Sequence, residues 1–242
     1  MATCRIGTSG WNYAHWRGVL YPPGLSATHW LEHYVREFST VEVNYSFYRL
    51  PDEGTFDHWR DQAPQGFIFA VKANRYLTHV KRLKDCAEPL GRFLERARRL
   101  ETHLGPILYQ LPPRWKADPA RLAAFGDLLP RDLVHVFEFR DDRWFTEPVR
   151  RVLEERALAF CIHDMAGMRC PDWVTAPTVY FRFHGAVRAY AGCYSRQRLG
   201  RIAQTIRDQL DRGRDVFAYF NNDAEGHAVR NARQLVRLVD AP

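Results

Sequence analysis

The chain has 242 residues, of which 46% are apolar, 14% aromatic and 26% charged. These fractions predict a globular protein with a sizeable core and exclude a disordered chain. No run approaches the roughly 18 apolar residues of a transmembrane helix, so a membrane protein is excluded as well. Because α/β barrels of this length commonly form one unit, we expect a single domain over residues 1–242.

The charge balance and the cysteines indicate the class of partner and the compartment. A formal net charge of +7 favours an anionic partner, for which a small phosphorylated molecule and nucleic acid are alternatives. The five cysteines are odd in number and scattered, as expected of reduced thiols. The amino-terminal segment lacks the apolar stretch of a signal peptide, which predicts a cytoplasmic protein.

Short β-rich runs alternate with helical patterns along the whole chain. Strands are predicted at residues 4–7, 40–44, 67–73, 107–111, 134–139, 159–163, 179–184 and 216–221. Helices are predicted at residues 28–38, 52–62, 88–103, 118–128, 147–155, 195–212 and 224–239. The alternation predicts an α/β fold, a TIM-like (β/α) barrel of about eight parallel strands with helices outside. Residues 165–178 include Pro171 and Pro177, so the helix after the sixth strand is predicted to be irregular or missing.

Polar side chains end strand after strand. In a parallel barrel the carboxyl ends of the strands meet at one mouth, where such residues form a site. Side chains alternate in direction along a strand, and the face toward the helices needs apolar residues. The residues that must then point into the barrel are Glu42, Lys72, Gln110, Glu138, Arg182 and His184.

The candidate catalytic residues are Glu42, Glu138, His184 and Lys72. Buried carboxylates beside cations suit general acid–base catalysis when their pKa values differ. Alternatives are two-carboxylate glycoside hydrolysis, and a Schiff base on Lys72 if its pKa is lowered. A further alternative is a divalent metal held by Glu42, Glu138, His163, Asp164 and His184. An internal ion-pair cluster, with Lys72 on Glu42 and Arg182 or Arg140 on Glu138, would explain the same residues without any ligand.

Candidate substrate-binding residues lie at the strand ends and in the loops that follow them. The first loop is rich in aromatic residues suited to stacking on a sugar or base, or to plugging the barrel, and Ser9 before it is interpreted as a loop hydroxyl. Basic residues, among them Arg75 and Arg188, follow the third and seventh strands and favour an anion. The predicted set is Trp11, Asn44, Tyr48, His79, Gln110, Arg140, Asp164, Arg182, Tyr190, Asn221 and Asn222.

Ordered motifs cover nearly the whole chain, from residue 7 to about residue 232. They include Gly7-Thr8-Ser9-Gly10-Trp11, Val41-Glu42-Val43-Asn44, Gln110-Leu111-Pro112-Pro113, Glu138-Phe139-Arg140, Arg182-Phe183-His184-Gly185 and Phe220-Asn221-Asn222-Asp223. With these motifs the chain resembles the DUF72, or YecE-like, family. The resemblance implies a TIM-barrel-like fold and no established activity. One departure is Asp141-Asp142-Arg143, where the family often has His-Pro-Ser.

The residues together predict a small anionic or sugar-like ligand at the barrel mouth. An enzyme of the hydrolase, lyase or isomerase class would use the carboxylates as acid or base and Lys72, Arg140 and Arg182 as anion clamps. No obligatory cofactor and no metal site are predicted. The alternatives are a nucleic-acid-binding or nuclease-like barrel, and a sensor or scaffold without chemistry.

Overall fold

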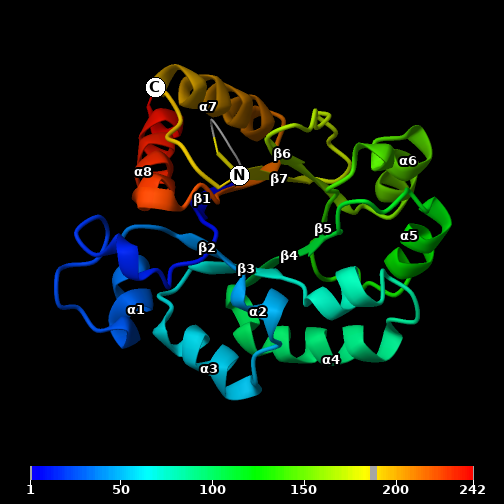
Figure 1. The fold of residues 1–242 in the computed structure, drawn as a ribbon, viewed down its shortest axis with the longest axis horizontal. Helices are drawn as coiled ribbons and strands as arrows, with labels where there is room; N and C mark the ends of the chain where they lie inside the picture. Colours follow the sequence, from blue (N-terminus) through cyan, green and yellow to red (C-terminus); the bar gives the residue numbers. More distant parts are fainter. Residues whose placement is uncertain (1, 186–189, 242) are drawn as a thin grey trace.

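Eight parallel strands form a barrel in the computed structural model, which describes residues 2–185 and 190–241 (Figure 1). Their order is β1-β8-β7-β6-β5-β4-β3-β2. The strands are β1 (Cys4–Thr8), β2 (Thr40–Val43), β3 (Ile68–Lys72), β4 (Leu104–Gln110), β5 (His135–Glu138), β6 (Ala159–His163), β7 (Thr178–Phe183) and β8 (Asp215–Phe220). The predicted TIM-like barrel is confirmed, with differences only at the strand ends.

Helices surround the strands: α1 (Trp30–Tyr34), α2 (Tyr45–Tyr48), α3 (Glu53–Gln62), α4 (Ala87–Ala97), α5 (Pro119–Gly126), α6 (Glu147–Glu155), α7 (Arg196–Asp211) and α8 (His227–Asp240). Side-chain caps define several of their starts. Asp52 accepts a hydrogen bond from the backbone of Thr55, Asp118 from Arg121, and Ser195 from Arg198. Each cap satisfies an amide that the first helical turn leaves unpaired.

The unit after β6 differs from its neighbours. The chain between β6 and β7 contains no helix, so the predicted irregularity is confirmed. The elements that were not predicted include the short helix α2, directly after β2, and a single π turn, Tyr76–Val80, after β3. Both follow strand ends, and both lie in loops that are too short for a sequence periodicity to appear.

The barrel closes between β1 and β2, where the two strands form fewer backbone hydrogen bonds than the other strand pairs do. We call this place the β1–β2 seam. Ser9 and Glu42 form an isolated bridge, and Gly10 N donates to Glu42 O over 2.8 Å. Lower in the seam, the Tyr34 hydroxyl of α1 accepts from Thr8 N at 3.0 Å and donates to Thr40 O at 3.1 Å. A side chain of α1 thus replaces a strand-to-strand hydrogen bond.

Two apolar layers result from the alternation of side chains along the strands. Residues such as Val41, Phe69 and Phe137 pack outward against the helices. The inner layer fills the barrel and comprises Ala70, Leu108, Val136, Ala159, Cys161, Tyr180, Phe217 and Tyr219. It occupies the interior below the polar strand ends, so the barrel is a filled core rather than a pore.

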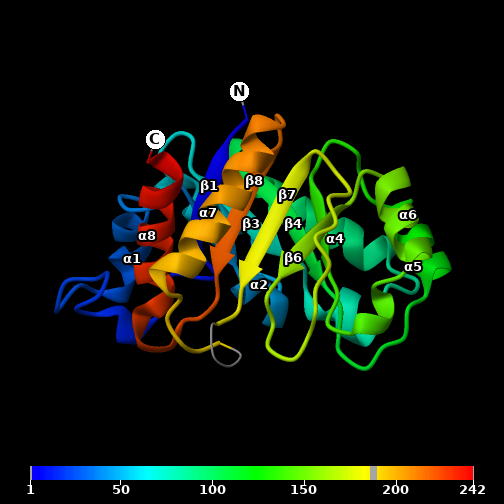
Figure 2. The ribbon, with the colours of Figure 1, turned by 90° about the horizontal axis from the view of Figure 1, so that it is seen from above.

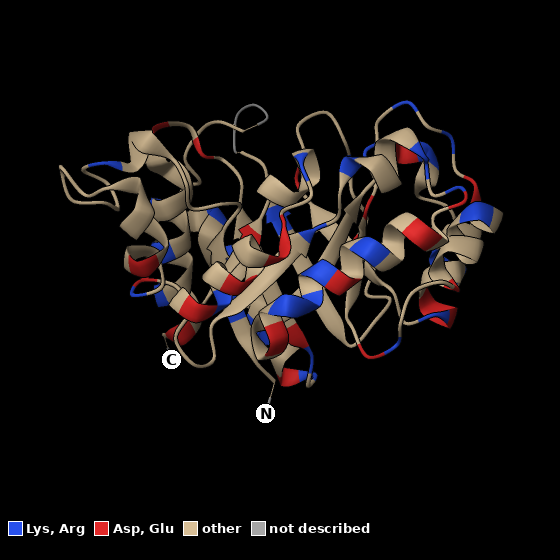
Figure 3. Cartoon of the chain, turned by 90° about the horizontal axis from the view of Figure 1, so that it is seen from below, with Lys and Arg blue, Asp and Glu red and all other residues tan. Residues whose placement is uncertain are grey.

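The two faces of the barrel are distinct. Strands β6, β7 and β8 run toward the face that lies opposite both chain termini (Figure 2). Since all strands are parallel, this face is the carboxyl-terminal mouth. Over the outer helices, Lys and Arg are interspersed with Asp and Glu (Figure 3). Within the described residues, no helix is long and apolar enough to cross a membrane.

Candidate functional site

A layer of charged side chains lies above the inner apolar layer, at the carboxyl ends of the strands. We call it the mouth cluster; its members are Glu42, Lys72, Gln110, Glu138, Arg140, Arg182 and His184. All come from strand ends or from the residues directly after them. The predicted inward direction fits the burial of Glu42, Lys72, Glu138, Arg182 and His184 and the contacts within the cluster, in which the half-buried Gln110 also takes part.

Arg182 is the centre of the mouth cluster. Its guanidinium is fully buried and donates to Glu42 at 2.7 Å and to Glu138. Burial alone would lower the pKa of Arg182, but the two carboxylates outweigh burial and raise it well above its ordinary value. Arg182 therefore stays charged and ties β7 to both β2 and β5 across the barrel.

The carboxylate of Glu42 is saturated with hydrogen bonds. Besides Arg182, it accepts from the Ser9 hydroxyl at 2.7 Å and from the Tyr180 hydroxyl at 2.7 Å. Glu42 itself is fully buried. Such a carboxylate is positioned and compensated within the protein, so its observed contacts are those of a residue that holds Arg182 and the β1–β2 seam in place.

Glu138 links the buried centre to the outer part of the mouth cluster. It contacts Arg182 on one oxygen and Arg140 on the other, and His184 Nε2 lies 3.4 Å away. Burial opposes ionisation of Glu138, but the guanidinium groups of Arg140 and Arg182 prevail and hold its pKa well below the usual range. The carboxyl is therefore ionised at neutral pH.

Arg140 lies at the outer side of the mouth cluster. Its Nη2 donates to His184 Nε2 at 3.1 Å, while the one partner of Nη1 among residues 2–185 and 190–241 is the Tyr190 hydroxyl, at 3.5 Å. Tyr190 is about half exposed. Burial lowers the pKa of His184 to about 3, so its imidazole is neutral, and Asn221 lies 3.3 Å from its Nδ1. The guanidinium edge at Nη1 is thus the least occupied part of Arg140.

Lys72 lies apart from the carboxylates. Its ammonium nitrogen donates to Gln110 at 2.7 Å and lies 4.2 Å from the centre of the Phe47 ring. The predicted alternative ion pair of Lys72 with Glu42 is wrong in detail, because Arg182 is the cation that Glu42 binds. His79 packs edge-on against the same Phe47 ring. Burial lowers the pKa of His79 to about 4, and the charge of Lys72 adds to this effect.

A cavity of about 490 Å³ lies beside the mouth cluster, between the first loop and helices α1, α2 and α3. The predicted residues Trp11, Asn44 and Tyr48 line it, together with Tyr13 and Trp59. Asn44 Oδ1 is buried there and has no hydrogen-bond partner among the described residues. The wall toward the mouth cluster is thin: Gly10 lines the cavity, and its neighbour Ser9 binds Glu42.

Asp164 and Asn222 are not brought into the mouth cluster. Asp164 accepts from His184 N at 2.7 Å, the Tyr194 hydroxyl at 2.6 Å and Arg198 at 2.9 Å, and so joins the end of β6 to α7. Asn222 is buried and donates to Gly192 O and to Asn231 of α8. Their contacts are those of residues that fix the loops around the mouth. Arg188, predicted at the rim, lies outside the described residues.

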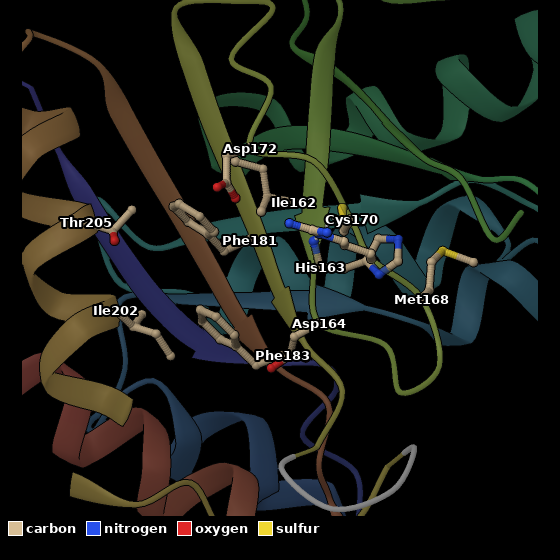
Figure 4. Close-up of a pocket in the computed structure, with 11 residues that line it drawn as sticks. Ile162, His163, Asp164, Met168, Cys170, Asp172, Phe181, Phe183, Ile202 and Thr205 are labelled. Atoms are coloured by element: carbon tan, nitrogen blue, oxygen red, sulfur yellow. Dashed lines mark hydrogen bonds between the residues drawn. The ribbon is translucent and has the colours of Figure 1, made fainter. Parts of the chain in front are cut away.

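A second cavity, of about 390 Å³, lies on the outside of the barrel where the helix after β6 is missing (Figure 4). Phe181 and Phe183 of β7 point into it with nearly parallel rings, opposite Ile202 of α7. The charged residues Asp164, Arg169 and Asp172 also line it. This cavity is separate from the mouth, because residues 181 and 183 face away from the barrel interior, toward which residue 182 points.

Comparison with known proteins agrees with this architecture. The family model described as a protein of unknown function, DUF72, matches residues 5–242. The chain belongs to the DUF72 family. UPF0759 protein YunF of Bacillus subtilis strain 168 is 25% identical over 272 residues, which cover 97% of this chain and 94% of that protein.

Solved structures of DUF72 proteins share the fold. The chain is 26% identical to a DUF72 family protein of Thermotoga maritima MSB8, with a TM-score of 0.90 and coverage of 99% of this chain and all of that one. A DUF72 family protein of Enterococcus faecalis V583 gives a TM-score of 0.85 at 19% identity, over 99% of this chain and 96% of that one. The second likeness shows the fold alone.

In this DUF72 protein, sequence reasoning missed three contributors to the site. Ser9, interpreted as a loop hydroxyl, binds Glu42, and Tyr180 binds the same carboxylate from below. Phe47 of the unpredicted helix α2 covers Lys72. Only Tyr180 had a signal in the sequence, since it precedes Arg182 by two residues and therefore shares its face of β7.

The described residues contain no group of three or more His, Cys, Asp or Glu side chains arranged to hold a metal ion. Of the five residues in the metal alternative, Glu42 and Glu138 bind guanidinium groups, and Asp164 binds Arg198.

Proposed function

We propose that the carboxyl-terminal mouth of the barrel is an active site for a small anionic or sugar-like molecule. One observation carries the proposal: Arg140 is fixed by Glu138 and His184, while its Nη1 edge, within the part of the chain that the structure describes, has only a 3.5 Å contact with the hydroxyl of the half-exposed Tyr190. A carboxylate or phosphate would replace that hydroxyl and gain a charge-assisted hydrogen bond.

The neighbouring cavity supports a ligand with a polar, ring-shaped part. Tyr13, Tyr48 and Trp11 provide aromatic surface, and Asn44 is among the polar residues that line the cavity. The cavity meets the mouth cluster at Gly10, because Gly10 lines the cavity and its neighbour Ser9 binds Glu42. A sugar-like molecule with an anionic group is therefore the class that uses both features.

The contacts also favour particular roles in proton transfer. The general acid–base role of Glu42 and Glu138 stays a prediction, because both carboxylates bind Arg182 and Glu138 is held in its ionised form. Burial lowers the pKa of Lys72 to about 7, which is the range that suits proton transfer at neutral pH. Lys72 is thus the member of the mouth cluster best suited to act as an acid or base.

The proposal is tested by binding. We expect inorganic phosphate or members of a panel of sugar phosphates and hydroxy acids to bind, as measured by calorimetry. Arg140→Met should weaken that binding about tenfold or more, since a hydrogen bond to a charged group contributes about 1.5–3 kcal/mol.

Arg143→Met is the matched control. Arg143 is a nearby arginine whose guanidinium pairs with Asp141 and is about half exposed. We expect this variant to bind like the wild type, and circular dichroism checks that both variants are folded. If nothing in the panel binds, or if Arg140→Met binds as tightly as the wild type, the proposal is wrong.

A further inference from the structure

Lys72 differs from the other lysines of the chain. The chain has lysines at positions 72, 81, 84 and 116. Lys72 is the one buried within the barrel mouth; Lys84 and Lys116 are exposed and Lys81 is half-buried. Long charged side chains are rarely buried unless they are paired with an opposite charge. A buried lysine at a strand end therefore calls for an explanation.

The partners of Lys72 are neutral. Gln110 accepts its one described hydrogen bond, Phe47 covers it, and no ion pair joins it to a described carboxylate. The negative charges of Glu42 and Glu138 are already compensated by Arg182, which forms an ion pair with each of them. The environment consequently disfavours the ammonium ion compared with water.

The pKa of Lys72 agrees with this geometry. Burial lowers it to about 7, and the positive charges of Arg182 and Arg140 add to burial against the opposing charges of Glu138 and Glu42. About half of the Lys72 side chains would then be neutral at neutral pH, against about one in three thousand for an ordinary lysine. A neutral amine is the nucleophilic form.

We propose that Lys72 Nζ forms a Schiff base with the carbonyl carbon of a small substrate that also carries a carboxylate or phosphate. This inference rests on the proposed function, because Arg140 supplies the anion contact. The amine nitrogen attacks the carbonyl carbon, the two amine protons pass to the carbonyl oxygen, and that oxygen leaves as water. The C=N bond replaces the C=O bond without any change in oxidation state.

The substrate class follows from these two groups. Arg140 would bind the anionic group of the substrate and so orient the molecule. The carbonyl carbon of the substrate would then face the amine of Lys72, which lies at the same mouth of the barrel. Small 2-oxo acids and phosphorylated aldehydes or ketones have both groups. The aromatic cavity beside Asn44 would hold the hydroxylated remainder of a longer substrate.

Reductive trapping tests the inference on the wild-type protein. Glyoxylate, the smallest anionic aldehyde, is added with sodium cyanoborohydride at neutral pH, and carboxymethyl-lysine is mapped by peptide mass spectrometry. We expect labelling of Lys72 to be more than about tenfold faster than that of Lys81, Lys84 or Lys116. Lys72→Met should lose this fast phase, and Lys84→Met, which removes an exposed lysine, should keep it.

The outcomes separate the two proposals. Labelling confined to residues 81, 84 and 116 overturns the Schiff-base inference, even if phosphate binds at Arg140. Glycolaldehyde, which is uncharged, provides the second arm. If glycolaldehyde and glyoxylate label Lys72 equally fast, and Arg140→Met changes neither rate, then Lys72 is the nucleophile but the proposed anion site is wrong.

Discussion

Arg182 and its two carboxylates show how single residues stabilise the mouth of the barrel. Desolvating such charges costs several kcal/mol each, and close pairing offsets that cost only when every partner is present. Here Glu42 receives three hydrogen bonds and Glu138 contacts two guanidiniums. The cluster is therefore a rigid support, from which Arg140 and His184 extend toward the mouth.

His184 makes the stability of the protein depend on pH. Its pKa is about 3 in the folded protein, against an ordinary value of 6.5. Between these values the unfolded chain binds a proton at His184 and the folded protein does not. Protonation therefore favours unfolding, and we expect the free energy of unfolding to decrease as the pH falls from about 6.5 to about 3.

Urea unfolding at a series of pH values measures this effect. In His184→Gln the decrease across the same interval should be shallower than in the wild type, because the titrating group is gone. His29→Gln, at an exposed position, is the control and should retain the wild-type slope. Equal slopes for the wild type and His184→Gln would contradict the assignment.

At the scale of elements, the β1–β2 seam is the place where the barrel needs help from a helix. Gly7 permits the close approach, since a Cβ atom there would lie 2.3 Å from Thr40 O. The Tyr34 hydroxyl then bridges Thr8 N and Thr40 O. The five-residue helix α1 thus has a structural role that its length alone would not indicate.

We expect Tyr34→Phe to lower the free energy of unfolding by about 1–3 kcal/mol, because it leaves a buried amide and a buried carbonyl without their partner. Denaturant unfolding followed by circular dichroism measures the change. Tyr45→Phe removes a hydroxyl from an exposed tyrosine and should leave the unfolding midpoint unchanged. A Tyr34→Phe midpoint equal to that of the wild type would show that the bridge contributes nothing.

The unit without a helix is a second consequence at this scale. Residues 164–177 join β6 to β7 as an irregular segment, and a cavity lined by Phe181 and Phe183 remains beside α7. The sequence indicated the missing helix through its prolines. The cavity itself depends on how closely the segment packs against β7, which no local pattern specifies.

At the scale of the whole molecule, all eight strands belong to one hydrogen-bonded sheet, and the residues between strands and helices form one continuous outer core. The single domain predicted for residues 1–242 should therefore unfold in one cooperative transition. Tryptophan fluorescence follows the exposure of side chains such as Trp16 and Trp144, which are buried in different parts of the barrel. Far-UV circular dichroism follows the loss of backbone secondary structure. We expect the same midpoint from both signals; two separated transitions would indicate more than one folding unit.

The distribution of charge also belongs to this scale. Acidic and basic residues are mixed over the outer helices, as seen in Figure 3. The net charge of +7 is thus spread over a surface that carries both signs. Nucleic-acid binding stays a prediction, and its mark would be an affinity that falls steeply as salt is added.

The sequence by itself determined the barrel, the inward side of five of its strands and the irregular sixth unit. These features depend on local rules: a two-residue alternation in strands, the repeat of strand and helix, and proline in the connecting segment. The same rules placed Glu42, Lys72, Glu138 and Arg182 at one mouth before any partner was known.

Only the tertiary structure decided which of these residues meet. Arg182 of β7 reaches Glu42 of β2 and Glu138 of β5, strands that are not its neighbours, because side chains at the same height cross the narrow barrel interior. Lys72 of β3, in contrast, binds Gln110 of the neighbouring strand β4 and is covered by Phe47. Contacts across a barrel depend on strand tilt and register over the whole sheet, and no segment of the sequence contains that information.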